Sequence, residues 1–202
     1  MMFKTLLPLV LASQSPRRRA LLTQVGIEFV PAQSDIEEKL SEGESPRQFV
    51  LRMAKEKAHC LVSRYPDAWL LAADTIVAID DEILGKPSSP VEAVAMLDRL
   101  SGCWHQVFTA YALLSPGARN TFMEVDMAQV RIASLERDFI TAYVAQGEPL
   151  DKAGAYALQG IGGSVVEALE GCPTTVIGLP MPMLLQTLLK CQVIKADRGT
   201  GI

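Results

Sequence analysis

Residues 69–79 read Trp-Leu-Leu-Ala-Ala-Asp-Thr-Ile-Val-Ala-Ile, an apolar run broken in its middle by one carboxylate. Its length and composition predict a buried strand. A lone buried carboxylate is costly, so Asp74 must be paired, hydrogen-bonded or bound to a metal, unless it lies at a strand end and faces solvent. The stretch therefore predicts a central strand and a candidate site, with a solvated Asp74 as the alternative.

Further strands are predicted on both sides of this run. Residues 6–12 and 107–114 are apolar enough for central strands, whereas residues 121–132 alternate as a half-exposed strand should. Val165-Val166 and Val176-Ile177 predict short later strands.

Helices are predicted after the Ser-Pro pairs, because serine is a good N-cap and proline suits the first helical position. Strands and helices alternate early and strands cluster later, which predicts an α/β fold with a mixed twisted sheet flanked by helices and a deep cleft. Residues 1–194 are expected to form one domain, and the polar tail 195–202 is expected to fray. The predicted helix starts are Ser15-Pro16, Ser45-Pro46, Ser89-Pro90, Ser134 and about Pro182.

The composition of the 202-residue chain excludes several classes of protein. Its net charge of −4 argues against a nucleic acid polymer as partner. Two histidines leave little for a histidine-rich metal site or a histidine-based triad. The four cysteines have long, irregular separations, which argues against a zinc site and suits reduced thiols in the cytoplasm.

The apolar stretch after Lys4 faintly resembles a signal peptide, but it is short, broken by Pro8 and followed directly by Arg17-Arg18-Arg19. A buried strand is the preferred interpretation. No stretch approaches the ~20 apolar residues of a membrane span, so no membrane partner is expected.

Lys57 and the segment from Val10 to Leu22 carry cations at unusual positions. Lys57 falls on the apolar stripe of its helix, so its amine is expected to meet an anion on the core side or to snorkel to water. Arg17 and Arg18 lie in a first helical turn directly after a strand, where they are unfavourable for the helix dipole unless an anion binds. The alternative is an ordinary N-cap with solvated arginines.

Three loops complete the candidate set: the glycine-rich segment 151–163, Lys86 in Gly85-Lys86-Pro87, and the acidic run 35–38. The first lacks the Rossmann and P-loop patterns, and each alone is compatible with a solvated loop. Together, the cations, the carboxylates and the glycine-rich loop suit a Mg²⁺-bound triphosphate and metal-assisted attack of water on phosphorus.

Short motifs that recur in order along nearly the whole chain carry a family resemblance. They are Ser13-x-Ser15-Pro16-Arg17-Arg18, Arg52-x-Ala54-x-x-Lys57-Ala58, Ala73-Asp74-Thr75, Gly85-Lys86-Pro87, Asp151-Lys152-Ala153-Gly154-Ala155-Tyr156 and Gly178-Leu179-Pro180. Together they resemble the signatures of the Maf family of nucleoside triphosphate pyrophosphatases. That family groups with the inosine-triphosphate pyrophosphatases, so the resemblance implies two lobes around a deep cleft.

The resemblance also implies an activity: hydrolysis of a nucleoside triphosphate to the monophosphate and pyrophosphate, with Mg²⁺ or Mn²⁺. Asp74 matches the catalytic proton acceptor, and it joins Glu37 or Glu38 as a metal-holding candidate. The substrate-binding positions that it implies are Ser13, Ser15, Arg17, Arg18, Lys57, Thr75, Lys86, Lys152 and Gln159.

Within that set, Arg17, Thr75 and Gln159 match positions that separate the branches of the family, and here they resemble the dTTP/UTP branch. The glutamine amide can present a donor and an acceptor to a pyrimidine edge. Two alternatives stay open: a purine substrate such as 7-methyl-GTP or ITP, and a nucleotide-binding regulator of septum formation. Segment 181–189 is expected to close the core rather than to form a homodimer contact.

Overall fold

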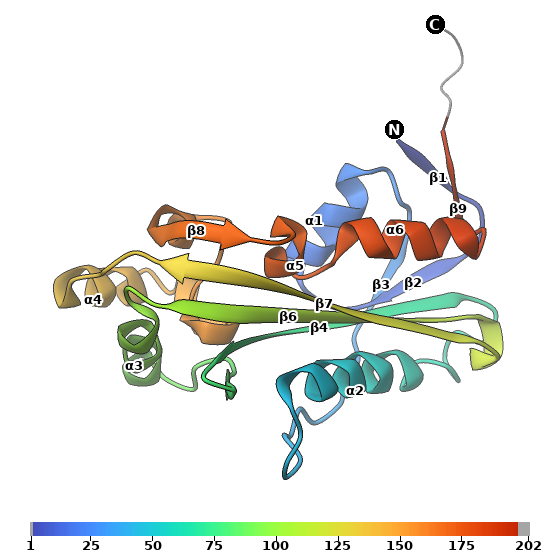
Figure 1. Ribbon diagram of the computed structural model, residues 1–202. Coiled ribbons are helices and arrows are strands. Elements are labelled where there is room, and N and C mark those ends of the chain that lie inside the picture. Colours follow the sequence, from blue (N-terminus) through green and yellow to red (C-terminus); the bar gives the residue numbers. More distant parts are fainter. Residues whose placement is uncertain (1, 198–202) are drawn as a thin grey trace, which may run out of the picture. The chain divides into compact units, whose positions relative to one another are not determined.

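The computed structural model, drawn as a ribbon in Figure 1, describes residues 2–197. Its chain forms two compact units that alternate along the sequence. Unit 1 takes residues 1–74, 110–125 and 178–202, and unit 2 takes residues 75–109 and 126–177. Three long strands cross the boundary between them: β4 (Trp69–Ile79), β6 (Trp104–Leu114) and β7 (Thr121–Ile132). The boundary in β4 falls between Asp74 and Thr75.

The main sheet also contains β2 (Leu9–Ala12), β3 (Val30–Ala32) and β8 (Val166–Glu170). Its order is β3-β2-β4-β6-β7-β8, with β5 (Glu82–Leu84) paired to β4. Strand β2 runs parallel to β3 and to β4, whereas β4 with β5 and β7 with β8 are antiparallel. The predicted mixed sheet is therefore confirmed, and β4 lies inside it. Its residues are buried from Trp69 to Asp74, as a covered strand requires.

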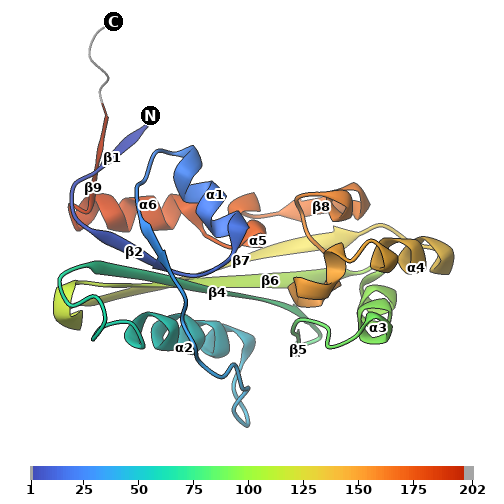
Figure 2. The ribbon, with the colours of Figure 1, turned by 180° about the vertical axis from the view of Figure 1, so that it is seen from behind.

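In unit 1, helix α2 (Pro46–His59) lies on one side of the strands, and α1 (Pro16–Gln24) and α6 (Met181–Lys190) lie on the other (Figures 1 and 2). The predicted serine caps are present, since Ser15 and Ser45 each accept a hydrogen bond from the backbone three residues on. The expected core role of segment 181–189 is confirmed, because Met181, Leu184 and Leu188 are buried.

Unit 2 has its own apolar core. Helix α3 (Pro90–Leu100), capped by Ser89, and α4 (Arg137–Ala145) both contribute buried residues to it. Three short 3₁₀ turns lie between α4 and strand β8 (Val166–Glu170): Glu148–Asp151, Ala153–Ala155 and Ile161–Val165. The short helix α5 (Pro173–Ile177) follows β8.

Two sequence predictions are corrected by these elements. Val176 and Ile177 were expected in a strand, but they end α5, because Pro173 supplies the fixed backbone angle that starts a helical turn. The predicted strand 6–12 is shorter, since β2 begins only after Pro8.

The segment predicted to fray begins within a strand. Lys195 and Ala196 belong to β9 (Ile194–Ala196), which pairs antiparallel with β1 (Phe3–Thr5). The Asp197 amide then donates to the Met2 carbonyl oxygen at 3.0 Å. These backbone bonds hold the segment, and residues 198–202 lie outside the described part of the chain.

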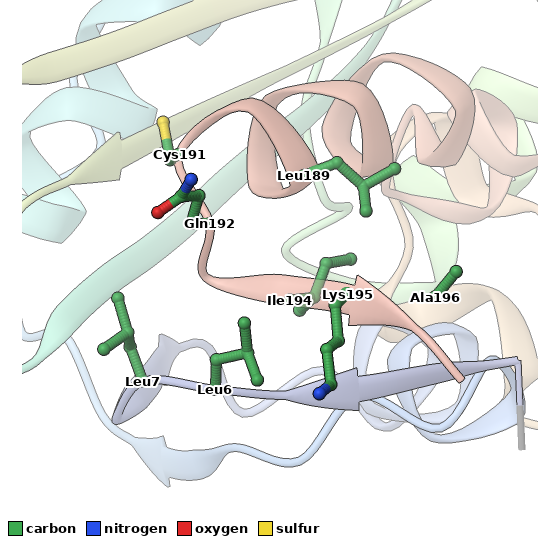
Figure 3. Close-up of a pocket in the computed structure, with 8 residues that line it drawn as sticks. All are labelled: Leu6, Leu7, Leu189, Cys191, Gln192, Ile194, Lys195 and Ala196. Atoms are coloured by element: carbon green, nitrogen blue, oxygen red, sulfur yellow. The ribbon is translucent and has the colours of Figure 1, made fainter. Parts of the chain in front are cut away.

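No helix among residues 2–197 is long and apolar enough to cross a membrane. Unit 1 carries a surface pocket between the end of α6, β9 and the segment after β1, shown in Figure 3. It is lined mainly by apolar side chains, including Leu6, Leu7, Leu189 and Ile194, and its one charged residue is Lys195. None of the candidate site residues lines it, so this pocket is separate from the predicted chemistry.

Candidate active site

The centre of the candidate site in unit 1 is a buried ion pair. The Lys57 amine lies 2.5 Å from Asp74 Oδ1, and the side chains of Lys57 and Asp74 are 11% and 6% exposed. Glu38 reaches the same Lys57 Nζ from the loop before α2, at 2.7 Å. The solvated alternatives for Asp74 and Lys57 are therefore wrong: the lysine on the apolar stripe of α2 meets two carboxylates.

Arg18 joins this cluster from the first turn of α1. Its Nε donates to the Gly178 carbonyl oxygen at 2.8 Å, and its Nη1 donates to Ser13 Oγ at 3.3 Å. Burial lowers the pKa of Arg18, and the negative charge of Asp74 opposes that effect in part. These bonds bring the Ser13–Arg18 motif and the Gly178–Pro180 motif together, close enough to Asp74 for Arg18 to feel its charge.

The two acidic candidates of the loop are separated by the structure. Glu38 lies on Lys57, whereas Glu37 is 71% exposed and pairs with Lys39 at 2.5 Å. Ser15 caps α1, Arg17 is half-buried on the same helix, and Ser13 is buried.

A divalent ion fits the donors of unit 1. Asp74 Oδ2 is buried and has no hydrogen-bond partner within residues 2–197, although Oδ1 is bonded to Lys57. Asp74 and Glu38 thus provide two carboxylates, and Mg²⁺ commonly takes one or two of these together with substrate phosphates and water. No group of three or more His, Cys, Asp or Glu side chains that could hold a metal occurs among those residues. The protein would therefore supply only part of the coordination shell.

Thr75, the first residue of unit 2, belongs to a chain of hydroxyl contacts. Its Oγ1 lies 2.9 Å from Thr109 Oγ1, and Thr109 in turn donates to the Thr175 carbonyl oxygen at 2.7 Å. The Thr175 hydroxyl donates to Asp126 at 2.5 Å. Because the one proton of Thr109 goes to Thr175, Thr109 must accept from Thr75, so Thr75 meets any further group through its oxygen lone pairs.

Thr109→Val should lower the free energy of unfolding by about 1–3 kcal/mol, since the fully buried valine keeps the shape but removes the donor to Thr175. Thr109→Ser keeps the hydroxyl and should recover most of that loss. Urea denaturation of the two variants measures the difference, and equal midpoints for valine and wild type would contradict the hydroxyl chain.

Lys86 and Lys152 lie on two loops that are joined by a backbone bond. The Gly154 amide donates to the Gly85 carbonyl oxygen at 3.1 Å. Gly154 has φ +66°, and a Cβ there would sit 2.8 Å from a Val77 methyl, so the position requires glycine. Lys86 is exposed, and Lys152 pairs with Asp151. Two predicted phosphate-side lysines therefore belong to one local loop assembly.

Gln159 is exposed on a loop that Glu148 holds in place. The Glu148 carboxylate accepts hydrogen bonds from the amides of Ile161 and Gly162, at 3.0 and 2.9 Å, and from Tyr143 at 2.8 Å. Burial opposes ionisation of Glu148, but these bonds outweigh it and lower its pKa. Glu148 was missed at the sequence level, because a single glutamate before a proline carries no motif.

Tyr156, which ends the Asp151–Tyr156 motif, is buried against His105. The Tyr156 hydroxyl and His105 Nε2 are 2.8 Å apart, and the rings meet edge to face. Burial lowers the pKa of His105 to about 4, so the ring is neutral near pH 7.

His105 should make folding less stable as pH falls from about 6.5 to about 4, because the unfolded chain binds a proton in that range and the folded chain does not. The shift corresponds to at most about 3 kcal/mol. His105→Gln keeps a polar partner for Tyr156 and should lose this pH-dependent component. The exposed His59 supplies the control His59→Gln, and equal pH dependence in wild type and His105→Gln would contradict the prediction.

Comparison with known proteins supports one family. The model of the Maf-like protein family matches residues 8–191. A dTTP/UTP pyrophosphatase of Methylobacillus flagellatus is 47% identical over 91% of this chain and 92% of its own. Another of the same name, from Desulfotalea psychrophila, is 44% identical over 96% and 99%. A third, from Myxococcus xanthus, is 49% identical over 86% and 87%.

The solved structures include the Ham1 protein of Staphylococcus aureus, which aligns with a TM-score of 0.50 and 13% identity over 92% of this chain and 99% of that one. This likeness concerns the fold alone, and it agrees with the predicted α/β class. The family match extends over every motif that carried the resemblance. The chain therefore belongs to the Maf family.

Proposed function

We propose that this protein hydrolyses dTTP and UTP to the monophosphate and pyrophosphate. The relatives named for that activity are 44–49% identical across most of both chains. The geometric observation that supports it best is the buried Asp74 carboxylate, which has one oxygen on Lys57 and the other without a partner among the described residues.

The residues of unit 1 would have separate roles in the hydrolysis. The Asp74 carboxylate would take the proton of the attacking water, as a general base held in place by Lys57. Arg18, held by Gly178 and Ser13 through Nε and Nη1, would place its positive charge where the phosphate oxygens bind. The amine of Lys57 would add positive charge where negative charge gathers in the transition state.

Lys86, Lys152 and the branch positions are assigned to the same substrate. The two lysines would neutralise phosphate charge, and Ser13, Ser15 and Arg17 would line the start of α1, where free amides attract anions. Mg²⁺ or Mn²⁺ would be held by Asp74 and Glu38, rather than by the exposed Glu37, and when bound would draw charge from the phosphate oxygens.

Thr75 and Gln159 would together recognise the nucleobase of the substrate. The lone pairs of Thr75 suit the N3–H that uracil and thymine carry and cytosine lacks, and the Gln159 amide suits the O4 carbonyl. A wrong base would leave these groups without partners in the complex, which favours discrimination by hydrogen bonds.

A panel of triphosphates with pyrophosphate detection tests the proposal. UTP and dTTP should be cleaved faster than CTP and the purine nucleotides. A strong preference for 7-methyl-GTP or ITP would instead assign the purine alternative. Binding without turnover of any member would favour the nucleotide-binding regulator.

The protein is further proposed to act in the cytoplasm on free nucleotides. In support, all four cysteines lie within the described residues and are free thiols. The protein is also proposed to form a homodimer, which a measurement of its mass in solution would test.

A further inference from the structure

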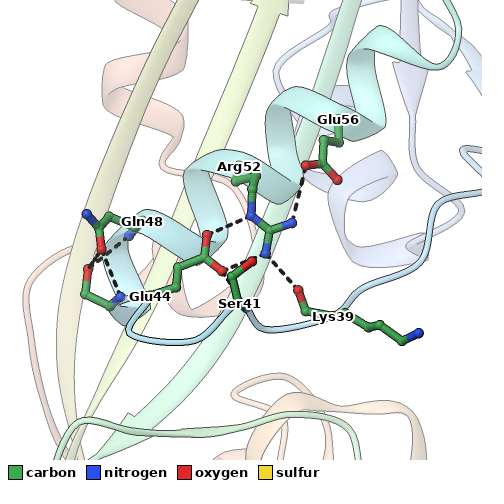
Figure 4. A network of polar contacts seen from close by, with 7 residues as sticks. Lys39, Ser41, Glu44, Gln48, Arg52 and Glu56 are labelled. Atoms are coloured by element: carbon green, nitrogen blue, oxygen red, sulfur yellow. Dashed lines mark hydrogen bonds and ion pairs between the residues drawn. The ribbon is translucent and has the colours of Figure 1, made fainter.

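The loop that carries Glu38 is fastened to helix α2 by Arg52, as Figure 4 shows. Arg52 Nε and Nη2 form a two-pronged contact with the Glu44 carboxylate, at 2.7 and 2.6 Å. Nη2 also donates to the Lys39 carbonyl oxygen at 2.7 Å, and Nη1 lies 3.3 Å from Glu56 Oε1. One side chain thus holds both ends of the segment between residues 39 and 44.

This clamp is more strongly built than an ordinary surface ion pair. The side chains of Arg52 and Glu44 are 31% and 10% exposed, and the fork geometry of the guanidinium matches the carboxylate. Glu44 Oε2 also accepts from the Ser41 amide at 3.2 Å, and α2 is anchored beside it by the Ser45–Gln48 capping box. The contact is therefore part of a network that orders the loop backbone.

Glu38 is consequently held by α2 at two places. Lys57 binds its carboxylate, and Arg52, five residues earlier on the same helix, binds the carbonyl of the adjacent Lys39. Lys57 cannot fix the backbone, because a lysine stem is flexible and its amine is a point charge. Arg52 supplies the missing constraint.

We propose that Arg52 is a positioning residue, which sets the place of Glu38 beside Asp74 by clamping Lys39 and Glu44. This inference rests on the proposed function, in which Glu38 and Asp74 hold the divalent ion of the substrate. Residues that orient metal ligands commonly change metal affinity by about 10–100-fold when they are lost.

The test compares Arg52→Gln with Arg99→Gln. The control removes a similar fork contact, in which Arg99 donates to both Glu82 oxygens at 2.8 Å in unit 2, so it matches the chemistry without touching the loop. In the metal-free protein, hydrogen exchange of a peptide covering residues 36–43 should speed up in Arg52→Gln only. With UTP, the half-saturating Mg²⁺ concentration should rise on the order of tenfold in Arg52→Gln, while the rate at saturating Mg²⁺ changes less.

Unchanged exchange in Arg52→Gln would overturn the clamp, and faster exchange with an unchanged Mg²⁺ requirement would overturn its link to Glu38. Glu44→Gln should give the same pattern more weakly, since Arg52 keeps the Lys39 carbonyl, and it takes the place of Arg52→Gln if that variant fails to fold. If wild type cleaves no triphosphate, the proposed function fails separately, and Mn²⁺ binding followed by electron paramagnetic resonance replaces the kinetic readout.

Discussion

Asp74→Asn is expected to lower pyrophosphate release from UTP by about 10³-fold, within the range that a positioned general base contributes. The amide has nearly the size of the carboxylate, but it cannot take a proton from water and it weakens any hold on a divalent ion. Lys57 keeps Glu38 as an ionic partner, at 2.7 Å, so the fold should survive.

The measurement is turnover at saturating UTP, with circular dichroism and the thermal midpoint as checks of folding. Asp67→Asn is the matched control, because Asp67 is an exposed aspartate just before β4. Retention of more than a tenth of wild-type turnover by a folded Asp74→Asn protein would remove Asp74 from the role of base.

Lys57→Met is expected to cost about 3–5 kcal/mol of folding stability, since it removes the cation that is bonded directly to the buried Asp74 carboxylate. Methionine fits the apolar face of α2, so the loss comes from the charge rather than from packing. The double variant Asp74→Asn/Lys57→Met removes both charges and should regain most of the stability. It should remain as inactive as Asp74→Asn.

Urea denaturation of the four proteins gives the coupling free energy between the two side chains. Glu38 adds little to it, because its side chain is 46% exposed and stays hydrated when Lys57 is lost. Simple additivity of the two single substitutions would show that the buried pair has no energetic coupling.

Much of the fold was predictable from local pattern. The limits of β4 and β7 follow from apolar runs and alternation, and the starts of α1, α2 and α3 follow from Ser-Pro pairs that cap helices. The exception at Val176-Ile177 arose because β-branched residues favour strands, whereas Pro173 three residues earlier decided the backbone.

The candidate site was predictable where one residue broke a pattern. Asp74 interrupts an apolar strand and Lys57 interrupts an apolar helix face, so each indicated that a buried charge needs a partner nearby. Glu44 and Thr109 interrupt no such pattern. Glu44 meets an arginine on another element, and Thr109 is a threonine in a strand, where that residue type is ordinary. Contacts of this kind depend on tertiary structure and leave no periodic trace.

The pairing of β1 with β9 has a consequence for engineering. It brings Met2 and Asp197 within one backbone hydrogen bond, so the described ends of the chain meet in a two-stranded ribbon. A short linker that joins Asp197 to Met2 in place of residues 198–202 would close the chain, and new ends could be opened at the exposed Gly117 in the turn between β6 and β7. Such a circular permutant would keep every candidate residue in place while moving a fusion partner to another part of unit 1.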